Sequence, residues 1–211
     1  MEMNKKYAIF DMDGTLIDSM VYWKHLATEY LERKGVKKIP SDLQERIKPM
    51  TMTESAALFV KEFGVDGTPD SVAAEMNYMM DEHYRNDIPL KEGVDRYLEA
   101  LKEAGVKMCV ASATAEPLMR TCLERLGVAD YFEFLLSCEE VGAGKNRPDV
   151  YFAAAERLAA EPEDIVVYED ALYAAETAKN AAFYVVGVYD ESADAHWNEM
   201  EALADEVIKE W

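Results

Sequence analysis

A chain of 211 residues, half of them hydrophobic, is long enough to bury a full core, as one large domain or as one domain with an insertion. Its net charge of −20 argues against nucleic acid or an anionic membrane as a partner, because both need a positively charged surface. No apolar run approaches the ~20 residues of a membrane-spanning helix, and the amino terminus leads straight into a predicted strand. The three cysteines show no metal-type spacing, which predicts reduced thiols. We therefore expect a cytoplasmic protein.

The first predicted element is a buried strand over residues 7–10, an uncharged and largely apolar run that ends at Asp11. Asp11 and Asp13 are two residues apart, so in an extended chain both project beyond the carboxyl end of the strand. Gly14 suits a tight turn after them. Open α/β sheets bind ligands in this region, where one carboxylate could act as a nucleophile and the other could move protons. For an isolated Asp-x-Asp, however, a helix cap or an acidic turn is the commoner explanation.

Helical patterns then follow one another with no convincing strand among them. They cover Met20–Lys34, Ser41–Lys48, Thr53–Phe63 and Ser71–Tyr84. This run predicts an all-helical inserted cap domain over residues 17–87, with the core formed by residues 1–16 and 88–211. Six of the twelve methionines fall in this insertion, and we expect most of them to pack between helices. Met50 or Met52 could instead line an adaptable substrate pocket.

From residue 90 onwards, predicted strands and helices alternate. The strands are expected at residues 106–111, 134–137, 165–168 and 184–188, with an edge strand at 207–208. The helices are expected at residues 93–104, 117–126, 149–159, 171–181 and 198–204, and a polar loop is expected to run from 138 to 145. Such alternation predicts an α/β fold, a doubly wound parallel sheet with helices on both faces and right-handed crossovers.

Polar residues stand at four positions just after predicted strands. They are Asp11 with Asp13, then Ser112, then Lys145 on a loop, and finally Glu169 with Asp170. Each has an ordinary explanation by itself: a capping serine, a solvated lysine, or an acidic helix start that suits the helix dipole. Because a parallel sheet presents the carboxyl ends of its strands at one edge, we expect all of them to meet there.

The stretch Asp11-Met-Asp-Gly-Thr-Leu-Ile-Asp-Ser19 resembles the first motif of the haloacid dehalogenase-like superfamily, most of whose members are Mg-dependent phosphohydrolases. Gly144-Lys145-Asn-Arg-Pro-Asp149-Val-Tyr151 is similar to the third motif of that family, and Val166-Val-Tyr-Glu-Asp170 is similar to the fourth. The resemblance covers nearly the whole chain. The helical insertion resembles the cap of the subfamily that contains phosphoglycolate phosphatase and β-phosphoglucomutase, which implies a Rossmann-like core.

The resemblance implies an enzyme, a phosphatase that hydrolyses a small phosphomonoester through an aspartyl-phosphate on Asp11. Asp13 would protonate the leaving oxygen and then activate water. A carboxylate that attacks a phosphate dianion meets a repulsion of about 4 kcal/mol per pair of unit charges at ~4 Å and an effective dielectric of ~20. A shared Mg²⁺ would reverse that repulsion.

The resemblance also assigns ligands. The metal would be held by Asp11, the backbone carbonyl of Asp13, Asp170 and, in support, Glu169. The substrate phosphate would be bound by Lys145, the hydroxyl of Ser112 and the backbone amides of Met12, Asp13 and Ala113. The partner would be a small phosphorylated metabolite, and the chain would be a monomer or a weak dimer.

The match departs from the family pattern in two places. The fourth motif usually continues with Ser and two glycines, whereas this chain has Ala171, Ala174 and Ala182, which puts hydroxyl support of the metal in doubt. β-Phosphoglucomutases carry a His where Trp23 stands, and the cap stretch 47–54 offers only Lys48 as a cation. A cap so poor in positive charge favours hydrolysis over a hexose-phosphate mutase of the β-phosphoglucomutase type. That mutase and a non-catalytic phosphate-binding protein are the alternatives.

Overall fold

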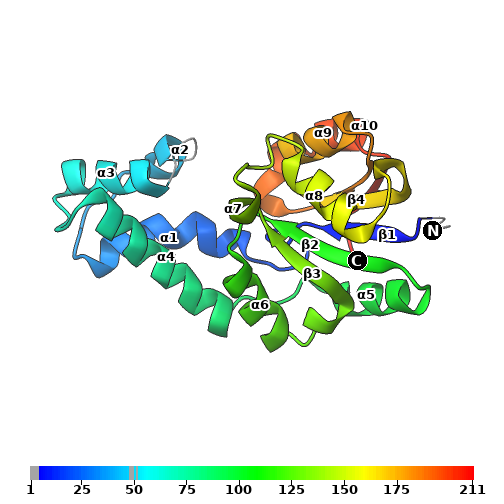
Figure 1. Cartoon of the computed structure of the whole chain (residues 1–211). Helices are drawn as coiled ribbons and strands as arrows, with labels where there is room; N and C mark the ends of the chain where they lie inside the picture. The colour runs from blue at the N-terminus through cyan, green and yellow to red at the C-terminus, as the bar shows by residue number, and fades with distance from the viewer. Residues whose placement is uncertain (1–4, 48–49, 51) are drawn as a thin grey trace. The chain divides into compact units, whose positions relative to one another are not determined.

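The computed structural model describes residues 5–47, 50 and 52–211 of the chain. They form two compact units, one made of Met1–Ser19 with Ile88–Trp211 and the other of Met20–Asp87 (Figure 1). The first unit contains the sheet and the second is helical. The domain bounds expected from the sequence, 1–16 with 88–211 and 17–87, differ from these unit bounds by a few residues.

The first unit is built on a parallel sheet of six strands in the order β3-β2-β1-β4-β5-β6. The strands are β1 (Tyr7–Phe10), β2 (Lys107–Ser112), β3 (Phe132–Ser137), β4 (Ile165–Glu169), β5 (Tyr184–Val188) and β6 (Glu206–Ile208). The first strand in the chain therefore lies in the middle, hydrogen-bonded to β2 on one side and β4 on the other. This order confirms the predicted doubly wound α/β fold.

Helices cover both faces of the sheet (Figure 1). They are α5 (Val94–Glu103), α6 (Glu116–Arg125), α7 (Cys138–Val141), α8 (Asp149–Leu158), α9 (Leu172–Asn180) and α10 (Trp197–Leu203), with short 3₁₀ turns η1 (Ala129–Tyr131), η2 (Pro162–Asp164) and η3 (Glu191–His196). The prediction of a polar loop over residues 138–145 was wrong in part, because residues 138–141 form the short helix α7. Ser137 accepts a hydrogen bond from the amide of Glu139 there and so caps this short helix, a local signal that hydrophobic periodicity cannot detect.

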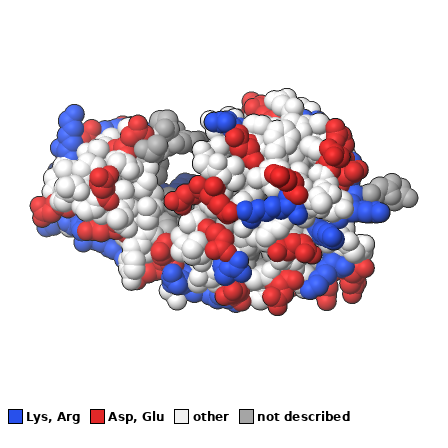
Figure 2. All heavy atoms as spheres, in the orientation of Figure 1, with Lys and Arg blue, Asp and Glu red and all other residues white. Residues whose placement is uncertain are grey.

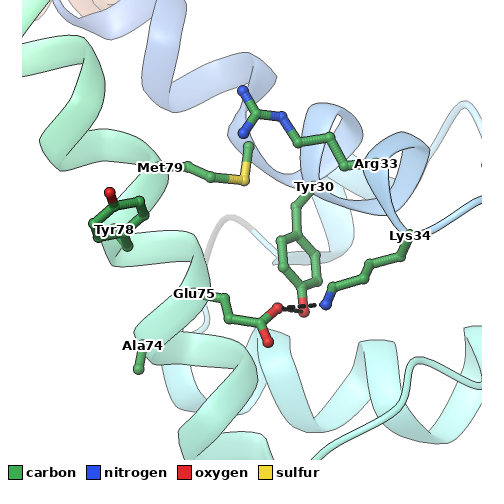
Figure 3. Close-up of a pocket in the computed structure, with 7 residues that line it drawn as sticks. All are labelled: Tyr30, Arg33, Lys34, Ala74, Glu75, Tyr78 and Met79. Carbon is green, nitrogen blue, oxygen red and sulfur yellow. Dashed lines mark hydrogen bonds and ion pairs between the residues drawn. The ribbon is translucent and has the colours of Figure 1, made fainter.

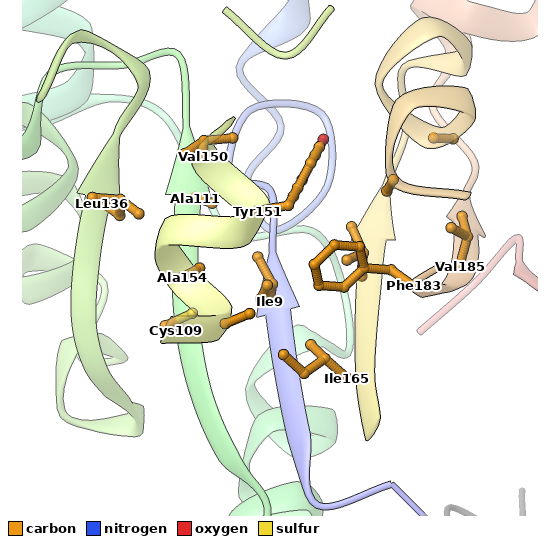
Figure 4. Close-up of a cluster of buried hydrophobic side chains, with 14 of the residues drawn as sticks. Ile9, Cys109, Ala111, Leu136, Val150, Tyr151, Ala154, Ile165, Phe183 and Val185 are labelled. Carbon is orange, nitrogen blue, oxygen red and sulfur yellow. The ribbon is translucent and has the colours of Figure 1, made fainter. Parts of the chain in front are cut away.

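One face of the sheet packs against α8, α9 and α10 through a continuous apolar cluster. Strand residues of alternating position, such as Ile9, Cys109 and Ile165, meet Ala154 and Phe183 in this layer (Figure 4). Alternation along the strands explains the set, since every second side chain of a strand points to the same face. The residues in between serve the opposite face, where Phe10 stacks on Tyr168 with ring centroids 4.3 Å apart. Burial on both faces explains why the strands read as unbroken apolar runs.

The helical unit consists of α1 (Met20–Arg33), α2 (Leu43–Ile47), α3 (Met52–Phe63) and α4 (Pro69–Asn86). Met76, Met79 and Met80 are buried in it, which agrees with a packing role for these methionines. A pocket of about 480 Å³ lies between α1 and α4, with seven lining residues (Figure 3). Inside it the Tyr30 hydroxyl donates to Glu75 over 2.8 Å, and Glu75 also pairs with Lys34. Tyr30, Lys34 and Glu75 thus satisfy one another's polar groups.

The remaining bulk properties agree with an ordinary folded protein. No helix of the described residues is long and apolar enough to cross a bilayer. Cys109, Cys122 and Cys138 are buried and free of disulfide bonds. Despite the net charge of −20, acidic and basic side chains are interspersed on the face in view in Figure 2.

A partly buried ion pair joins the segment after the helical unit to the loop that follows β5. Lys91 Nζ lies 2.8 Å from Asp190 Oδ2 and also donates to the carbonyl of Tyr189. Burial alone would raise the pKa of Asp190, but hydrogen bonds from Lys91 and Ser192 outweigh it and lower that pKa below its ordinary value. The pair therefore stabilises the folded state while Asp190 is ionised.

Replacing Asp190 with Asn should lower the free energy of unfolding by about 2 kcal/mol at pH 7. Because the folded-state pKa is depressed, this contribution is complete above the unfolded pKa of about 3.9 and is lost as the pH falls through the lower, folded value. Urea unfolding of the wild type and Asp190→Asn between pH 7 and pH 3 measures it. The exposed Asp194, changed to Asn, is the matched control. A difference that disappears already near pH 6 would contradict the assignment.

Candidate active site

The turn after β1 presents its two aspartates at the carboxyl edge of the sheet. The amide of Asp11 still donates to Tyr168 of the neighbouring strand β4 at 2.9 Å, so the backbone at Asp11 is fixed by the sheet. The chain then turns sharply, with the Met12 carbonyl accepting from the amides of Leu16 and Ile17. Gly14 has φ 83°, a left-handed conformation that glycine adopts without steric cost. The local sequence therefore forces the turn that displays both side chains.

Three carboxylates gather beside this turn. Asp11, Glu169 and Asp170 each offer an oxygen, and these oxygens lie within 4.8 Å of one another. Asp11 directly follows β1, Glu169 is the last residue of β4 and Asp170 follows it, and β1 and β4 are neighbours in the sheet. Lys145, from the loop between α7 and α8, places its ammonium group against both Asp11 and Glu169. All four residues are at most 7% exposed, so four ionisable groups share one buried site.

Burial dominates the electrostatics of this cluster. It raises the pKa of Asp11 to about 7, a rise that Lys145 opposes and Glu169 and Asp13 reinforce. Burial likewise raises the pKa of Asp170 well above its ordinary value, with the Asp11 charge adding to the effect. For Lys145, burial acts to lower the pKa, but the two flanking carboxylates raise it well above the ordinary value. One lysine thus carries a fixed positive charge among an excess of carboxylates.

Asp13 lies in a separate network of hydroxyl groups. Its Oδ1 accepts from Ser19 at 2.7 Å, and its Oδ2 accepts from Thr114 at 2.7 Å and from Ser112 at 3.4 Å. Ser112 ends β2, on one side of β1, so strand order brings this group beside the turn. Three hydroxyl donors fix the direction of the Asp13 carboxylate, as a group that transfers protons requires.

Every predicted site residue lies among the described residues. Asp11, Ser112, Lys145, Glu169 and Asp170 are buried and Asp13 is half-buried. The turn after β1 contains Met12, which is fully buried, and the end of β2 is followed by Ala113, which is exposed. The cap cation Lys48 lies outside the described residues. The structure thus brings Asp11, Lys145, Glu169 and Asp170 together, with Asp13 and Ser112 in the adjoining hydroxyl network.

Sequence reasoning missed four polar side chains of this region. Thr114 and Ser19 hold Asp13, Thr15 donates to Asp170 at 3.4 Å, and the buried Tyr151 donates to Glu169 at 2.9 Å. Thr15 and Ser19 belong to the first motif, and Thr114 follows Ser112 by two residues. Their positions relative to the predicted site residues could have identified those three as candidates. Tyr151 ends the stretch that resembles the third motif, but its contact with Glu169 could not be predicted, since a Tyr in an amphipathic helix reads as an ordinary core residue.

The arrangement defines a class of enzyme site. A parallel α/β sheet presents a buried carboxylate cluster with one lysine, next to an aspartate held by hydroxyls, and such a site can transfer an anionic group. Its donor set also fits Mg²⁺. The clustered donors are all carboxylate oxygens, which suit a hard cation, and the three carboxylates face a single lysine, Lys145, so a bound cation would offset their excess negative charge.

Comparison with known proteins narrows the class to a family. The model of the haloacid dehalogenase-like hydrolases matches residues 8–188, so the chain belongs to that family. It is 27% identical to a phosphorylated carbohydrates phosphatase of Thermotoga maritima over 82% of this chain and 80% of the relative. It is 28% identical to the β-phosphoglucomutase of Bacillus subtilis, over 87% of this chain and 83% of the relative.

The solved structures agree with this assignment. A crystal structure of a Thermotoga maritima protein, named as a candidate β-phosphoglucomutase, superimposes with a TM-score of 0.81 at 26% identity. The superposition covers 97% of this chain and 94% of that chain. The predicted family and the fold class are therefore confirmed, and so is the predicted enzyme class, a phosphoric monoester hydrolase of haloacid dehalogenase-like type.

Proposed function

We propose that the protein is a Mg²⁺-dependent phosphatase that hydrolyses a small phosphomonoester through an aspartyl-phosphate on Asp11. The observation that carries the proposal is the pairing of Lys145 with Asp11 and Glu169 inside a buried carboxylate cluster, beside the hydroxyl-held Asp13. A protein that only bound phosphate would need the lysine, but it would need neither a buried nucleophile nor a proton carrier.

Each residue of the site has a role in one or both steps of the proposed reaction. An Asp11 oxygen attacks phosphorus while the bond to the leaving oxygen breaks, and Asp13 gives that oxygen its proton. Lys145 neutralises charge on Asp11 and on the phosphoryl oxygens, and the Ser112 hydroxyl with the amides of Met12, Asp13 and Ala113 holds those oxygens. Asp13, now a base, then removes a proton from the water that attacks phosphorus and frees Asp11.

Mg²⁺ would be held by Asp11, Asp170 and the Asp13 backbone carbonyl, with Glu169 in support. When bound, the ion supplies positive charge that screens the repulsion between carboxylate and phosphate. The two compact units are proposed to be the two domains of this enzyme, a catalytic core and a helical cap. The proposed substrate is a small phosphorylated metabolite. The proposed oligomeric state is a monomer or a weak dimer, and the proposed location is the cytoplasm.

Removal of divalent cations should abolish phosphate release. With EDTA the rate is expected to fall by at least about 100-fold, because the charge that screens Asp11 from phosphate is lost. Added Mg²⁺ should restore it. Malachite-green detection of phosphate from p-nitrophenyl phosphate, glycerol phosphate and sugar phosphates measures this. Undiminished release after chelation and desalting would contradict the metal assignment.

A hexose-phosphate mutase of the β-phosphoglucomutase type is the second candidate, favoured by the similarity to the Bacillus subtilis enzyme and to the Thermotoga maritima structure. Against it, Trp23 stands where the β-phosphoglucomutase pattern described above has a His. The Trp23 indole donates to the Tyr84 hydroxyl at 3.2 Å within the helical unit. β-Glucose-1-phosphate with a catalytic amount of the glucose bisphosphate separates the two. Free phosphate supports the phosphatase, glucose-6-phosphate without net phosphate supports the mutase, and binding without turnover supports a phosphate-binding protein.

A further inference from the structure

Tyr151 is a buried polar side chain to which the proposed reaction assigns no role. It lies in the first turn of α8 and is 1% exposed. Its hydroxyl donates to Glu169 Oε1 at 2.9 Å, and the carbonyl of Ala174 lies at 3.5 Å, at the limit of a hydrogen bond. Its ring packs near Phe183 in the apolar layer between α8 and the sheet (Figure 4).

The packing explains a ring at this position but not a hydroxyl. A phenylalanine would fill the same apolar layer, and a buried hydroxyl costs free energy unless it finds a partner. The partner here is a carboxylate of the site. Glu169 continues the alternation of Ile165 and Val167, whose side chains belong to the layer under α8, so the fold points Glu169 at α8. The hydroxyl therefore meets Glu169 because of strand register.

The same oxygen of Glu169 serves two donors. Oε1 accepts both from the Tyr151 hydroxyl and from Lys145 Nζ, and that ammonium group also lies 6.0 Å from the Tyr151 ring centroid. A glutamate has three rotatable bonds, and a second donor from a rigid helix removes that freedom. Fixing Glu169 in turn fixes the point at which Lys145 is held against Asp11.

We propose that Tyr151 is a positioning residue, which acts through Glu169 to hold Lys145 where it can neutralise a transferring phosphoryl group. The inference rests on the proposed phosphatase function and extends it to a residue that touches neither substrate nor metal. Lys145 depends on a relay of Tyr151 and Glu169, and loss of the hydroxyl loosens the lysine while the apolar layer stays filled.

The test compares Tyr151→Phe with Tyr97→Phe. The control also removes one hydrogen-bonded tyrosine hydroxyl: Tyr97 is half-buried, and its hydroxyl lies 2.9 Å from the Tyr168 hydroxyl, away from the carboxylate cluster. Tyr151→Phe is expected to lower kcat about tenfold and to weaken binding of inorganic phosphate about tenfold by calorimetry. The Mg²⁺ concentration for half-maximal activity should stay within about twofold of the wild type, because Glu169 only supports the proposed metal site and the main ligands, Asp11 and Asp170, are not contacted by Tyr151.

A double variant tests whether Tyr151 acts on phosphate binding through Lys145. In Lys145→Met the further change Tyr151→Phe should leave phosphate affinity unchanged, since both substitutions remove the same interaction. Three results would overturn the inference: wild-type kinetics and phosphate affinity in Tyr151→Phe, an equal loss in Tyr97→Phe, or a change confined to the Mg²⁺ requirement. If no phosphomonoester is hydrolysed at all, the proposed function fails, and the calorimetric comparison still decides whether Tyr151 governs phosphate binding.

Discussion

Asp11→Asn is expected to reduce phosphate release by at least about 10³-fold, because the amide oxygen is a far weaker nucleophile than the carboxylate. The substitution is nearly isosteric and relieves the crowding of buried negative charge around Asp11, where burial raises the pKa to about 7. The variant should therefore fold and unfold at least as cooperatively as the wild type. Steady-state phosphate release with the best substrate of the panel measures the loss, and thermal unfolding checks the fold.

The matched control is Asp18→Asn, an exposed carboxylate of the same motif. It should keep activity within about twofold of the wild type, because an exposed side chain away from the cluster contributes little. Asp11→Ala, in which no amide can revert to a carboxylate, should be as inactive as Asp11→Asn. Substantial phosphate release by Asp11→Ala would mean that another group, or water alone, attacks the phosphorus.

Asp13→Asn is expected to lower kcat by about 10²–10⁴-fold for alkyl phosphates, whose leaving oxygen needs a proton. With p-nitrophenyl phosphate the leaving group needs no proton, so transfer to Asp11 should remain fast while the second step, which needs a base, becomes slow. Stopped-flow absorbance should then show a burst of nitrophenol equal to the enzyme concentration, followed by slow turnover. The burst distinguishes a defect in proton transfer from general damage to the site.

A variant with a partial defect supplies the check on this role. Thr114→Val, which removes one of the hydroxyls that hold Asp13, is the intermediate variant, with a smaller loss for the same substrates. Equal losses for alkyl and nitrophenyl esters, without a burst, would remove Asp13 from the proton-transfer role.

The sheet could be predicted from the sequence because its strands are short apolar runs that end abruptly in polar residues. The run before Asp11 and the run before Glu169 both break where the chain leaves the sheet, and parallel pairing then forces their ends together. Helix ends were less accurate: α4 starts at Pro69, whose preceding Thr68 forms a capping box with Ser71, two residues before the expected start. Capping is local chemistry that periodicity does not report.

The charged residues of the site could be predicted from the sequence, whereas the side chains that hydrogen-bond to them could not. The clustering of Asp11, Lys145 and the acidic pair follows from topology, because each stands at a strand end or in the loop after one. The partners of these residues depend on side-chain direction in three dimensions. Thr114, just after β2, reaches Asp13 in the turn after the neighbouring strand β1, and Tyr151 reaches Glu169 from a helix. Neither contact can be read from spacing along the chain.

The central claim is that Asp11 carries the phosphoryl group during turnover, and trapping that intermediate tests it most directly. Enzyme quenched in acid during turnover is reduced with borohydride, which converts an aspartyl-phosphate to homoserine, and the peptide is then sequenced by mass spectrometry. The account predicts homoserine at position 11, enriched in Asp13→Asn and absent without substrate or in Asp11→Asn. Phosphate release with position 11 unmodified, or with the modification on another residue, would contradict it.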